Sequence, residues 1–220
     1  ADENLYLLDG NPVYHVNHLL GFFSAFNPDA IKNTRFYKGS FPAEYGGRLS
    51  SVVDVRMNDG NRQEYHGNIS VGLLSARANL EGPIVKDRSS FNVSVRRTWL
   101  DLITGTALAI INKNSDTKES FGYHFFDINA KVNHSFSERS RAYLSFYMGQ
   151  DAFRQGSKEK HEDSDDMFLW RWGNLIGSAG WNYVFGQKLF GNLMVGYSRF
   201  RSHIRQEAKG YEIEGNREER

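Results

Sequence analysis

The most regular feature of the second part of the chain is a strict alternation of apolar and polar residues. Between residues 123 and 136, Phe126 and Val132 lie on one face of the chain, and Asp127 and Lys131 lie on the other. A period of two residues is that of a β-strand with one buried face. The same alternation predicts further strands over residues 67–73, 75–82, 91–99, 142–151, 168–184 and 189–205.

The lengths of these strands and of their connections favour a membrane barrel. Several predicted strands exceed the length of about five or six residues that is usual in globular sheets, and a tilted membrane-spanning strand needs about 9–11 residues. Short turns on one side of a sheet and long loops on the other are typical of an outer-membrane barrel. The sequence predicts short turns at residues 85–89, 137–139 and 185–188, and long polar loops at residues 104–120 and 155–166.

Three tryptophans, Trp170, Trp172 and Trp181, fall near the ends of the long predicted strand 168–184. In a membrane barrel they would form a girdle at the interface, where the indole ring meets lipid and its N–H group meets water. In a soluble sheet they would fill a core or form a sugar-binding face. Both interpretations stay open on the pattern alone.

Residues 1 to about 60 have a different character and predict a small α/β unit. Residues 19–26 predict a short helix. Asn27-Pro28-Asp29 predicts another helix start, because Asn is a preferred N-cap and Pro is favoured at the first helical position. The predicted strands of this part cover residues 4–9, 34–37 and 51–56.

Composition narrows the class of protein further. Aromatic residues make up 14% of the chain, and 21 glycines stand against only 4 prolines, which suits long antiparallel strands with tight turns. The net charge of +1 provides no general attraction for nucleic acid. The absence of cysteine excludes a disulfide framework and thiolate zinc sites.

A series of motifs in the first sixty residues resembles the plug domain of TonB-dependent outer-membrane receptors. Residues 8–14 are similar to the V-D-G-x-P strand and turn of that family, and residues 34–56 are similar to its closing strand, turn, Tyr-Gly pair and valine-rich strand. Lys38 stands where the family usually has Arg, and Leu49-Ser50-Ser51 replaces a small-Gly-Gly run, so the version looks like that of Bacteroidetes-type receptors. The residues of the plug motif are Asp9, Gly10, Lys38, Gly39, Tyr45, Gly46 and Gly47.

The resemblance implies a mainly β protein of two parts. Residues 1–60 would be the C-terminal half of the plug domain, a small α/β piece. Residues 61–220 would be the first strands, about seven, of a transmembrane β-barrel whose family has about 22 strands. Both ends of the sequence fall within these patterns, so we expect a fragment of a longer receptor.

For function, the resemblance implies a receptor and transporter in the outer membrane of a Gram-negative cell. It would take up a nutrient (a siderophore, cobalamin, glycan or peptide) into the periplasm. The implied partners are a TonB-type energising protein that acts through a segment upstream of Ala1, the nutrient, outer-membrane lipid and a surface lipoprotein. Neither nucleic acid nor a cofactor is expected, and the chain is not expected to be an enzyme.

Two sets of site residues follow from this assignment. In the family, the loop after the D-G-x-P turn reaches toward the substrate, which implies ligand contact at the plug apex by Tyr14, His15, Asn17 and His18. Alternatively, the apolar residues of this loop pack a small core and the histidines lie on its rim. If the alternating strands form a barrel wall, their polar faces line the lumen, and the candidates for this role are Arg77, Glu81, Arg96, Asp127, Lys131 and Arg141.

Catalytic and metal-binding motifs are not evident. The sequence has no G-x-S-x-G elbow, P-loop or G-x-G-x-x-G fingerprint, and its histidines do not form H-E-x-x-H. The acidic run 161–166 offers hard oxygen ligands for Ca²⁺ but lacks the glycine and terminal glutamate of an EF-hand. We therefore expect a solvated loop there and no metal site.

The alternative function is that of a soluble β-sandwich module that binds carbohydrate or protein. That hypothesis predicts that the face carrying Phe126, Ile128 and Val132 packs against a second sheet. The receptor hypothesis predicts that the same face meets lipid.

Overall fold

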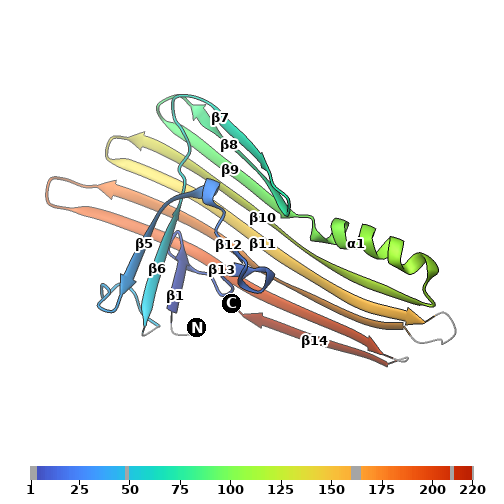
Figure 1. The fold of residues 1–220 in the computed structure, drawn as a ribbon. Coiled ribbons are helices and arrows are strands. Elements are labelled where there is room, and N and C mark those ends of the chain that lie inside the picture. The colour runs from blue at the N-terminus through green and yellow to red at the C-terminus, as the bar shows by residue number, and fades with distance from the viewer. Residues whose placement is uncertain (1–3, 48–49, 160–164, 209–210, 220) are drawn as a thin grey trace.

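The computed structural model describes residues 4–47, 50–159, 165–208 and 211–219, and this part of the chain is mainly β. A small N-terminal unit, residues 4–57, lies against one face of a long sheet of antiparallel strands (Figure 1). We call the face that the unit contacts the inner face of the sheet, and the opposite one the outer face.

The N-terminal unit is built on a four-stranded sheet in the order β2-β1-β6-β5. β6 lies in the middle, parallel to β1 and antiparallel to β5. Its valine-rich sequence suits this position, because a central strand that is covered on both faces needs an apolar run. The strands are β1 (Asn4–Leu8), β2 (Asn11–Pro12), β5 (Ile31–Lys38) and β6 (Ser51–Met57), so the three strands predicted for this part are confirmed.

The helix predicted over residues 19–26 is wrong. The structure has a single 3₁₀ turn there, η1 (Leu19–Gly21). The short strand β4 (Phe23–Ser24) follows and pairs with β3 (Asn17–His18). The backbone gives the reason, since φ is 48° at Leu19 and 109° at Gly21, and such values do not continue a right-handed helix.

The helix start predicted at Asn27 is confirmed. The Asn27 side chain accepts a hydrogen bond of 3.2 Å from the Asp29 backbone N–H, and Pro28 is the first residue of the 3₁₀ helix η2 (Pro28–Ala30). The helix ends after one turn, where β5 begins.

The long sheet contains eight strands in sequence order, β7 to β14, each antiparallel to its neighbours. The longest, β10, has 21 residues. The turns after β8, β10 and β12 are short, as predicted. The bounds are β7 (His66–Val71), β8 (Ser75–Val85), β9 (Ser89–Thr98), β10 (Thr117–Ser137), β11 (Ser140–Glu159), β12 (Asp165–Val184), β13 (Phe190–Ala208) and β14 (Tyr211–Glu219).

Three predictions about this sheet need correction. The supposed loop 104–120 is largely helical, with α1 (Leu100–Ile111) followed by η3 (Asn112–Asn114), because its first half contains the good helix formers Ala107, Leu108 and Ala109. The supposed loop 155–166 is mostly strand, since β11 and β12 extend into it. The strand β14 was not predicted, because its charged sequence lacks apolar alternation and it forms by pairing with β13.

The two faces of the sheet are the reverse of those of a soluble sheet. On the inner face, Asp127 is 0% exposed and Lys131 is 5% exposed. On the outer face, Val132 is 41% exposed and Leu144 is 64% exposed. We call the apolar part of this face the outer band; its outward-facing side chains lie within residues 128–136 of β10, 142–148 of β11, 175–181 of β12 and 193–197 of β13.

The tryptophans do not form one girdle. Trp172 is 3% exposed on the inner face, and Trp170 lies beside it with the ring centroids 4.2 Å apart. Trp181 is 43% exposed on the outer face, and its Nε1 donates to Ser140 Oγ at 3.0 Å. The girdle prediction is therefore wrong for Trp170 and Trp172, which pack toward the N-terminal unit.

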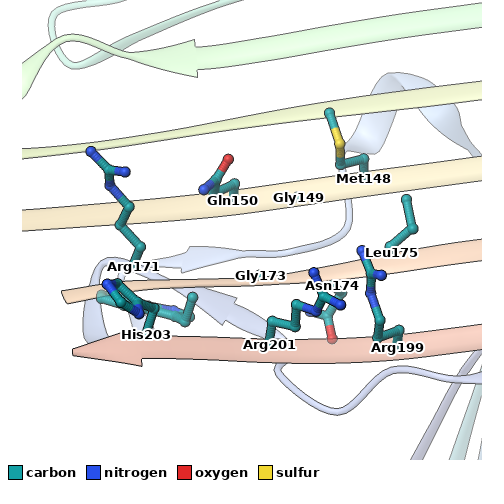
Figure 2. A pocket seen from close by; sticks show the side chains of 11 residues that line it. Met148, Gly149, Gln150, Arg171, Gly173, Asn174, Leu175, Arg199, Arg201 and His203 are labelled. Atoms are coloured by element: carbon teal, nitrogen blue, oxygen red, sulfur yellow. The ribbon is translucent and has the colours of Figure 1, made fainter. Parts of the chain in front are cut away.

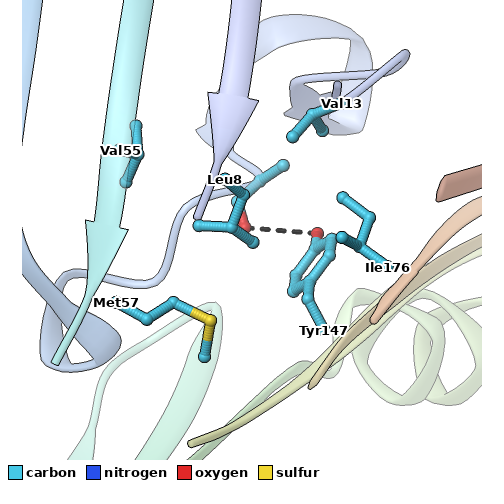
Figure 3. Packing of buried hydrophobic residues seen from close by; sticks show 7 residues of the cluster. Leu8, Val13, Val55, Met57, Tyr147 and Ile176 are labelled. Atoms are coloured by element: carbon cyan, nitrogen blue, oxygen red, sulfur yellow. Dashed lines mark hydrogen bonds between the residues drawn. The ribbon is translucent and has the colours of Figure 1, made fainter. Parts of the chain in front are cut away.

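Apolar contacts join the N-terminal unit to the inner face in two clusters. In the first, Leu8, Val55 and Met57 of the unit pack near Tyr147 and Ile176 of the sheet (Figure 3). The second cluster is aromatic and consists of Tyr123, Phe125 and Trp172, with Leu19 and Phe23 packed against it. Polar residues beside these two clusters form the candidate functional site.

Candidate functional site

Buried charges of the inner face meet the N-terminal unit at two places. We call the first the histidine cluster (His18, Arg96, Tyr123, Asp127, Asp151) and the second the lysine cluster (Asp9, Lys32, Asp59, Lys131). The sheet supplies Arg96, Tyr123, Asp127, Lys131 and Asp151 from β9, β10 and β11. Because side chains alternate between the two faces along a strand, these side chains all lie on the inner face.

In the histidine cluster, Arg96 and Asp127 form an ion pair away from water. Arg96 Nε and Nη2 donate to Asp127 Oδ2 at 2.8 and 2.6 Å. The side chains are 7% and 0% exposed. Charge-assisted hydrogen bonds of this geometry are strong, and a buried carboxylate needs them, because losing water is costly for a charge.

His18 of the N-terminal unit lies between two carboxylates of the sheet. Its Nδ1 is 2.7 Å from Asp151 Oδ2, and its Nε2 is 3.6 Å from Asp127 Oδ2. The ring stacks on Phe125 with the centroids 4.1 Å apart, and the Tyr123 hydroxyl donates to Asp151. His18 thus connects the Arg96–Asp127 pair of β9 and β10 with the Tyr123–Asp151 pair of β10 and β11.

Arg96 of this cluster and the neighbouring Tyr147 hold the segment of residues 13–25 by its backbone. Arg96 Nη2 donates to the Ser24 carbonyl oxygen at 2.8 Å, and the Tyr147 hydroxyl donates to that of Ala25 at 3.3 Å. Because these bonds replace water at buried carbonyl groups, removing a donor would leave an unsatisfied acceptor.

The lysine cluster fixes the base of the N-terminal unit to β10. Lys131 Nζ lies 3.3 Å from the Asp9 carboxylate and 3.1 Å from Asp59 Oδ1, and it donates to the Met57 carbonyl oxygen at 3.1 Å. Asp9 also accepts from the Met57 N–H at 3.1 Å. One buried ammonium therefore joins the turn after β1, the end of β6 and the segment that leads to β7.

Acidification is expected to weaken the lysine cluster through Asp59. Burial opposes ionisation of this carboxyl, but Lys32 and Lys131 outweigh it and lower its pKa from the ordinary 3.8. A lowered pKa contributes stability that is present above pH 3.8 and is lost as pH falls through the folded-state pKa. Lys32→Ala should raise this pKa toward 3.8, with a stability cost of at most about 1 kcal/mol because Lys32 is half exposed.

The measurement is the pH dependence of the unfolding midpoint of the full-length protein, in acid and at neutral pH. Lys113→Ala, at an exposed position in η3 before the opposite end of β10, removes an equal charge and serves as the control. If the Lys32→Ala profile coincided with the control profile through the acid range, the assigned role of Lys32 would be wrong.

A third group of polar contacts lies on β12 and β13. Asn174 Nδ2 donates to the His15 carbonyl oxygen at 2.7 Å, and its Oδ1 accepts from the His15 N–H at 3.4 Å. Ser198 Oγ donates to the Pro12 carbonyl oxygen at 2.5 Å, and Asn11 Nδ2 donates to Ser178 Oγ. The strand β2 and the loop that follows it are thus bound to the sheet on this side as well.

The predicted apex residues lie in different environments. Tyr14 is 36% exposed and Asn17 is exposed, whereas His15 is partly buried beside Trp172. Burial lowers the pKa of His15 from its ordinary 6.5, against the opposing effect of Asp151. His18 is 2% exposed in the histidine cluster, so its burial does not fit contact with an external ligand.

The six lumen candidates lie on strands of the long sheet, and most of them contact the N-terminal unit. Besides the clustered residues, Arg77 Nε is 3.2 Å from Asp29, and Glu81 accepts from Asn58 Nδ2 at 3.0 Å. Arg141 is exposed and lines a cavity of about 230 Å³ together with Lys131.

The plug-motif residues have structural contacts. Asp9 (φ 45°) and Gly10 (φ 83°) make the turn after β1, and Gly39 and Gly47 also have positive φ. The Tyr45 hydroxyl donates to Asp54 at 3.4 Å, and burial and this carboxylate raise the pKa of Tyr45. Lys38 ends β5, Gly46 is exposed, and Leu49 lies outside the described residues.

Other chemistry has no support among the described residues. In those ranges, no group of three His, Asp or Glu is placed to hold a metal ion. Most of the acidic run 161–166 lies outside the described residues. No helix in the described part of the chain is long and apolar enough to cross a membrane.

Sequence reasoning missed several residues of the site. Tyr123, Asp151 and Asn174 lie on the inner face and bind the N-terminal unit, but they were not among the candidates. The sequence did indicate the face on which Asp151 lies, because Asp151 is four residues from Tyr147 in an alternating strand and therefore shares its face. Its partner His18 could not be inferred, because 133 residues separate the two.

Comparison with known proteins gives similarity at the level of solved structures only. No family model and no curated protein matches the chain. The siderophore receptor PirA from Acinetobacter baumannii is similar over 93% of this chain and 41% of its own, with 15% identity and a TM-score of 0.45. A variant of the ferric enterobactin receptor PfeA from Pseudomonas aeruginosa is similar over 92% and 42%, with 13% identity and a TM-score of 0.45. The chain thus spans about two fifths of the length of these receptors, and at such values we base no functional argument on them.

Proposed function

We propose that this chain is part of a TonB-dependent outer-membrane receptor that takes up a nutrient into the periplasm. Residues 4–60 would belong to the plug, and residues 66–219 would be the first strands of the barrel. The motif residues around Asp9-Gly10 and Tyr45-Gly46 support the assignment, and Lys38 favours a Bacteroidetes-type receptor with a surface lipoprotein partner. Transport, coupling to a TonB-type protein and nutrient binding would be properties of the whole receptor.

The observation that carries the proposal is the reversal of the two faces of the long sheet. Burying charges such as Asp127 and Lys131 while exposing a band of Val, Leu and Phe side chains would be unfavourable in water. In a membrane the same arrangement is favourable, because lipid covers the outer band and the plug covers the polar lumen face. Figure 1 shows the N-terminal unit on one face of the sheet only.

The soluble β-sandwich hypothesis predicts a second sheet against Phe126, Ile128 and Val132. In the described part of the chain, the second sheet lies on the opposite, polar face, and Val132 is 41% exposed. The expectation of that hypothesis is therefore not met.

The plug apex is the ligand-binding part of the proposal. Tyr14 and Asn17 are exposed on the loop that follows β2, and His15 lies partly buried beside them. We assign nutrient contact to these three residues, while His18 holds the loop to the sheet.

Cysteine accessibility in intact outer membranes tests the proposal, since the chain has no cysteine of its own. Arg141→Cys lies on the inner face and is exposed, and Leu144→Cys lies on the outer band and is 64% exposed. In the full-length receptor, a small water-soluble maleimide should label Arg141→Cys and leave Leu144→Cys unlabelled until detergent is added. Rapid labelling of Leu144→Cys without detergent would refute a lipid-facing outer band.

A further inference from the structure

The outer face changes from apolar to basic over a few rows of paired residues. Arg199 of β13 is paired with Leu175 in the last row of the outer band, Arg201 with Gly173 in the next row, and His203 with Arg171 in the row after that. Rows that face the same way lie two residues, or about 7 Å, apart along a strand. The basic side chains therefore form a narrow rim along one edge of the outer band.

The arginines of this rim differ in their partners. Arg201 Nη2 is 3.3 Å from Glu218, and His203 is 3.4 Å from Glu214, both on β14. The side chains of Arg171 and Arg199 have no hydrogen-bond or ion-pair partner within the described ranges. The two guanidinium groups are thus available to an anion.

A pocket of about 370 Å³ lies between these arginines and the edge of the outer band. Figure 2 shows Arg171 on β12 and Arg199 and Arg201 on β13, with Gly173 between them. Gly173 has no side chain opposite Arg201, which leaves the centre of the pocket open. The residues that line this pocket include Met148, Gln150, Arg171, Leu175, Arg199 and Arg201.

The pocket has one apolar and one basic side. Met148, Leu175 and Arg199 form the last row of the outer band, whereas Gln150, Arg171 and Arg201 lie beyond its edge. An arginine on a lipid-facing surface is least costly at the interface with water, so this rim should lie at the level of the lipid headgroups. A ligand that fits both sides is an amphiphile with an anionic head.

The position of the helix α1 also supports placing the basic rim at the level of the lipid headgroups. It packs over the outer face, where Asp101 is 3.4 Å from His124, and Leu108 lines a second cavity together with Arg171. Leu102 and Ile110 are 59% and 72% exposed. An apolar helix that lies along a surface beside cationic side chains is typical of a membrane interface.

We propose that the pocket binds a headgroup phosphate of an outer-membrane lipid, with Arg171 and Arg199 as the phosphate ligands. Arginine suits this role, because its planar guanidinium donates two parallel hydrogen bonds to phosphate oxygens. The acyl chains would cover Met148 and Leu175. The proposal rests on the proposed function, since it requires the outer band to face lipid.

The test uses the full-length receptor in phosphatidylcholine vesicles that contain a minor fraction of bisphosphorylated lipid A. Lipid retained by the receptor after detergent extraction is measured by native mass spectrometry. Arg171→Gln and Arg199→Gln together should weaken lipid A retention by about tenfold or more. Arg139→Gln with Lys188→Gln removes the same charge at exposed positions of the opposite turns and should leave retention unchanged.

Membrane insertion is measured separately by protease protection and heat-dependent electrophoretic mobility. Correct insertion with lost lipid A retention supports the proposal, and correct insertion with unchanged retention overturns it. Displacement of lipid A by inorganic pyrophosphate at equal concentration would also overturn it, because the site would then recognise free phosphate. Failure of the wild-type receptor to insert would instead refute the proposed function, and the single substitutions provide the test should the double variant not insert.

Discussion

Arg96→Met is expected to loosen the N-terminal unit from the sheet and to be among the most destabilising single changes in the chain. It would leave the Asp127 carboxylate, which is 0% exposed, without its arginine, and it would remove the donor to the Ser24 carbonyl. Breaking a buried ion pair by removing one partner costs about 3–5 kcal/mol. The loss should appear as a lower unfolding midpoint of the full-length protein and as faster proteolysis within residues 13–25.

Two further variants make the Arg96 result specific. Arg77→Met breaks the pair with Asp29, but Arg77 is 39% exposed, so the expected loss is about 1 kcal/mol or less. Arg96→Met combined with Asp127→Asn removes both charges and should recover part of the stability. If Arg96→Met and Arg77→Met had equal effects, burial of the histidine cluster would not be the cause of its contribution.

Gly60→Ala is expected to have the second large effect. Gly60 lies in the segment between β6 and β7 and has φ 80°, and a Cβ atom there would lie 2.1 Å from the Phe91 backbone oxygen. A left-handed conformation costs a residue other than glycine about 1–2 kcal/mol. The clash with backbone adds to this, because β9 cannot move without losing its pairing with β8 and β10, and overpacking typically costs a further ~1–3 kcal/mol.

Gly39→Ala separates the two contributions. Gly39 has φ 89°, but a Cβ atom there would meet nothing within 4 Å. This variant should therefore show only the conformational cost, and the unfolding midpoint should fall clearly less than for Gly60→Ala. Equal midpoints for the two variants would show that the contact with Phe91 is relieved at little cost.

Much of the fold follows from local properties of the sequence. Alternation located the strands β8 to β13, and the short turns after β8, β10 and β12 lie where polar residues interrupt it. The cap at Asn27 was predicted because its side chain bonds a backbone group two residues away. These features depend on neighbours in the sequence, which is why a pattern can show them.

The failures involve interactions between distant residues. The charged sequence of β14 has no apolar alternation, so it does not predict a strand. The strand is stabilised by its pairing with β13, including the ion pair of Arg201 with Glu218. The pattern left a membrane interface and a core both open for Trp172, and only the structure shows that it packs under the N-terminal unit. The lysine cluster was seen only in part, because 122 residues separate Asp9 from Lys131.

The sequence by itself determined which residues share a face, since alternation along a strand assigns Asp127 and Lys131 to one side and Val132 to the other. It did not determine which of the two faces is covered, because a period of two is the same whether the polar or the apolar face is buried. Only the tertiary structure decided that the polar face is covered, since Arg96 reaches the Ser24 carbonyl oxygen and Lys131 reaches the Asp9 carboxylate only when the N-terminal unit lies against the sheet.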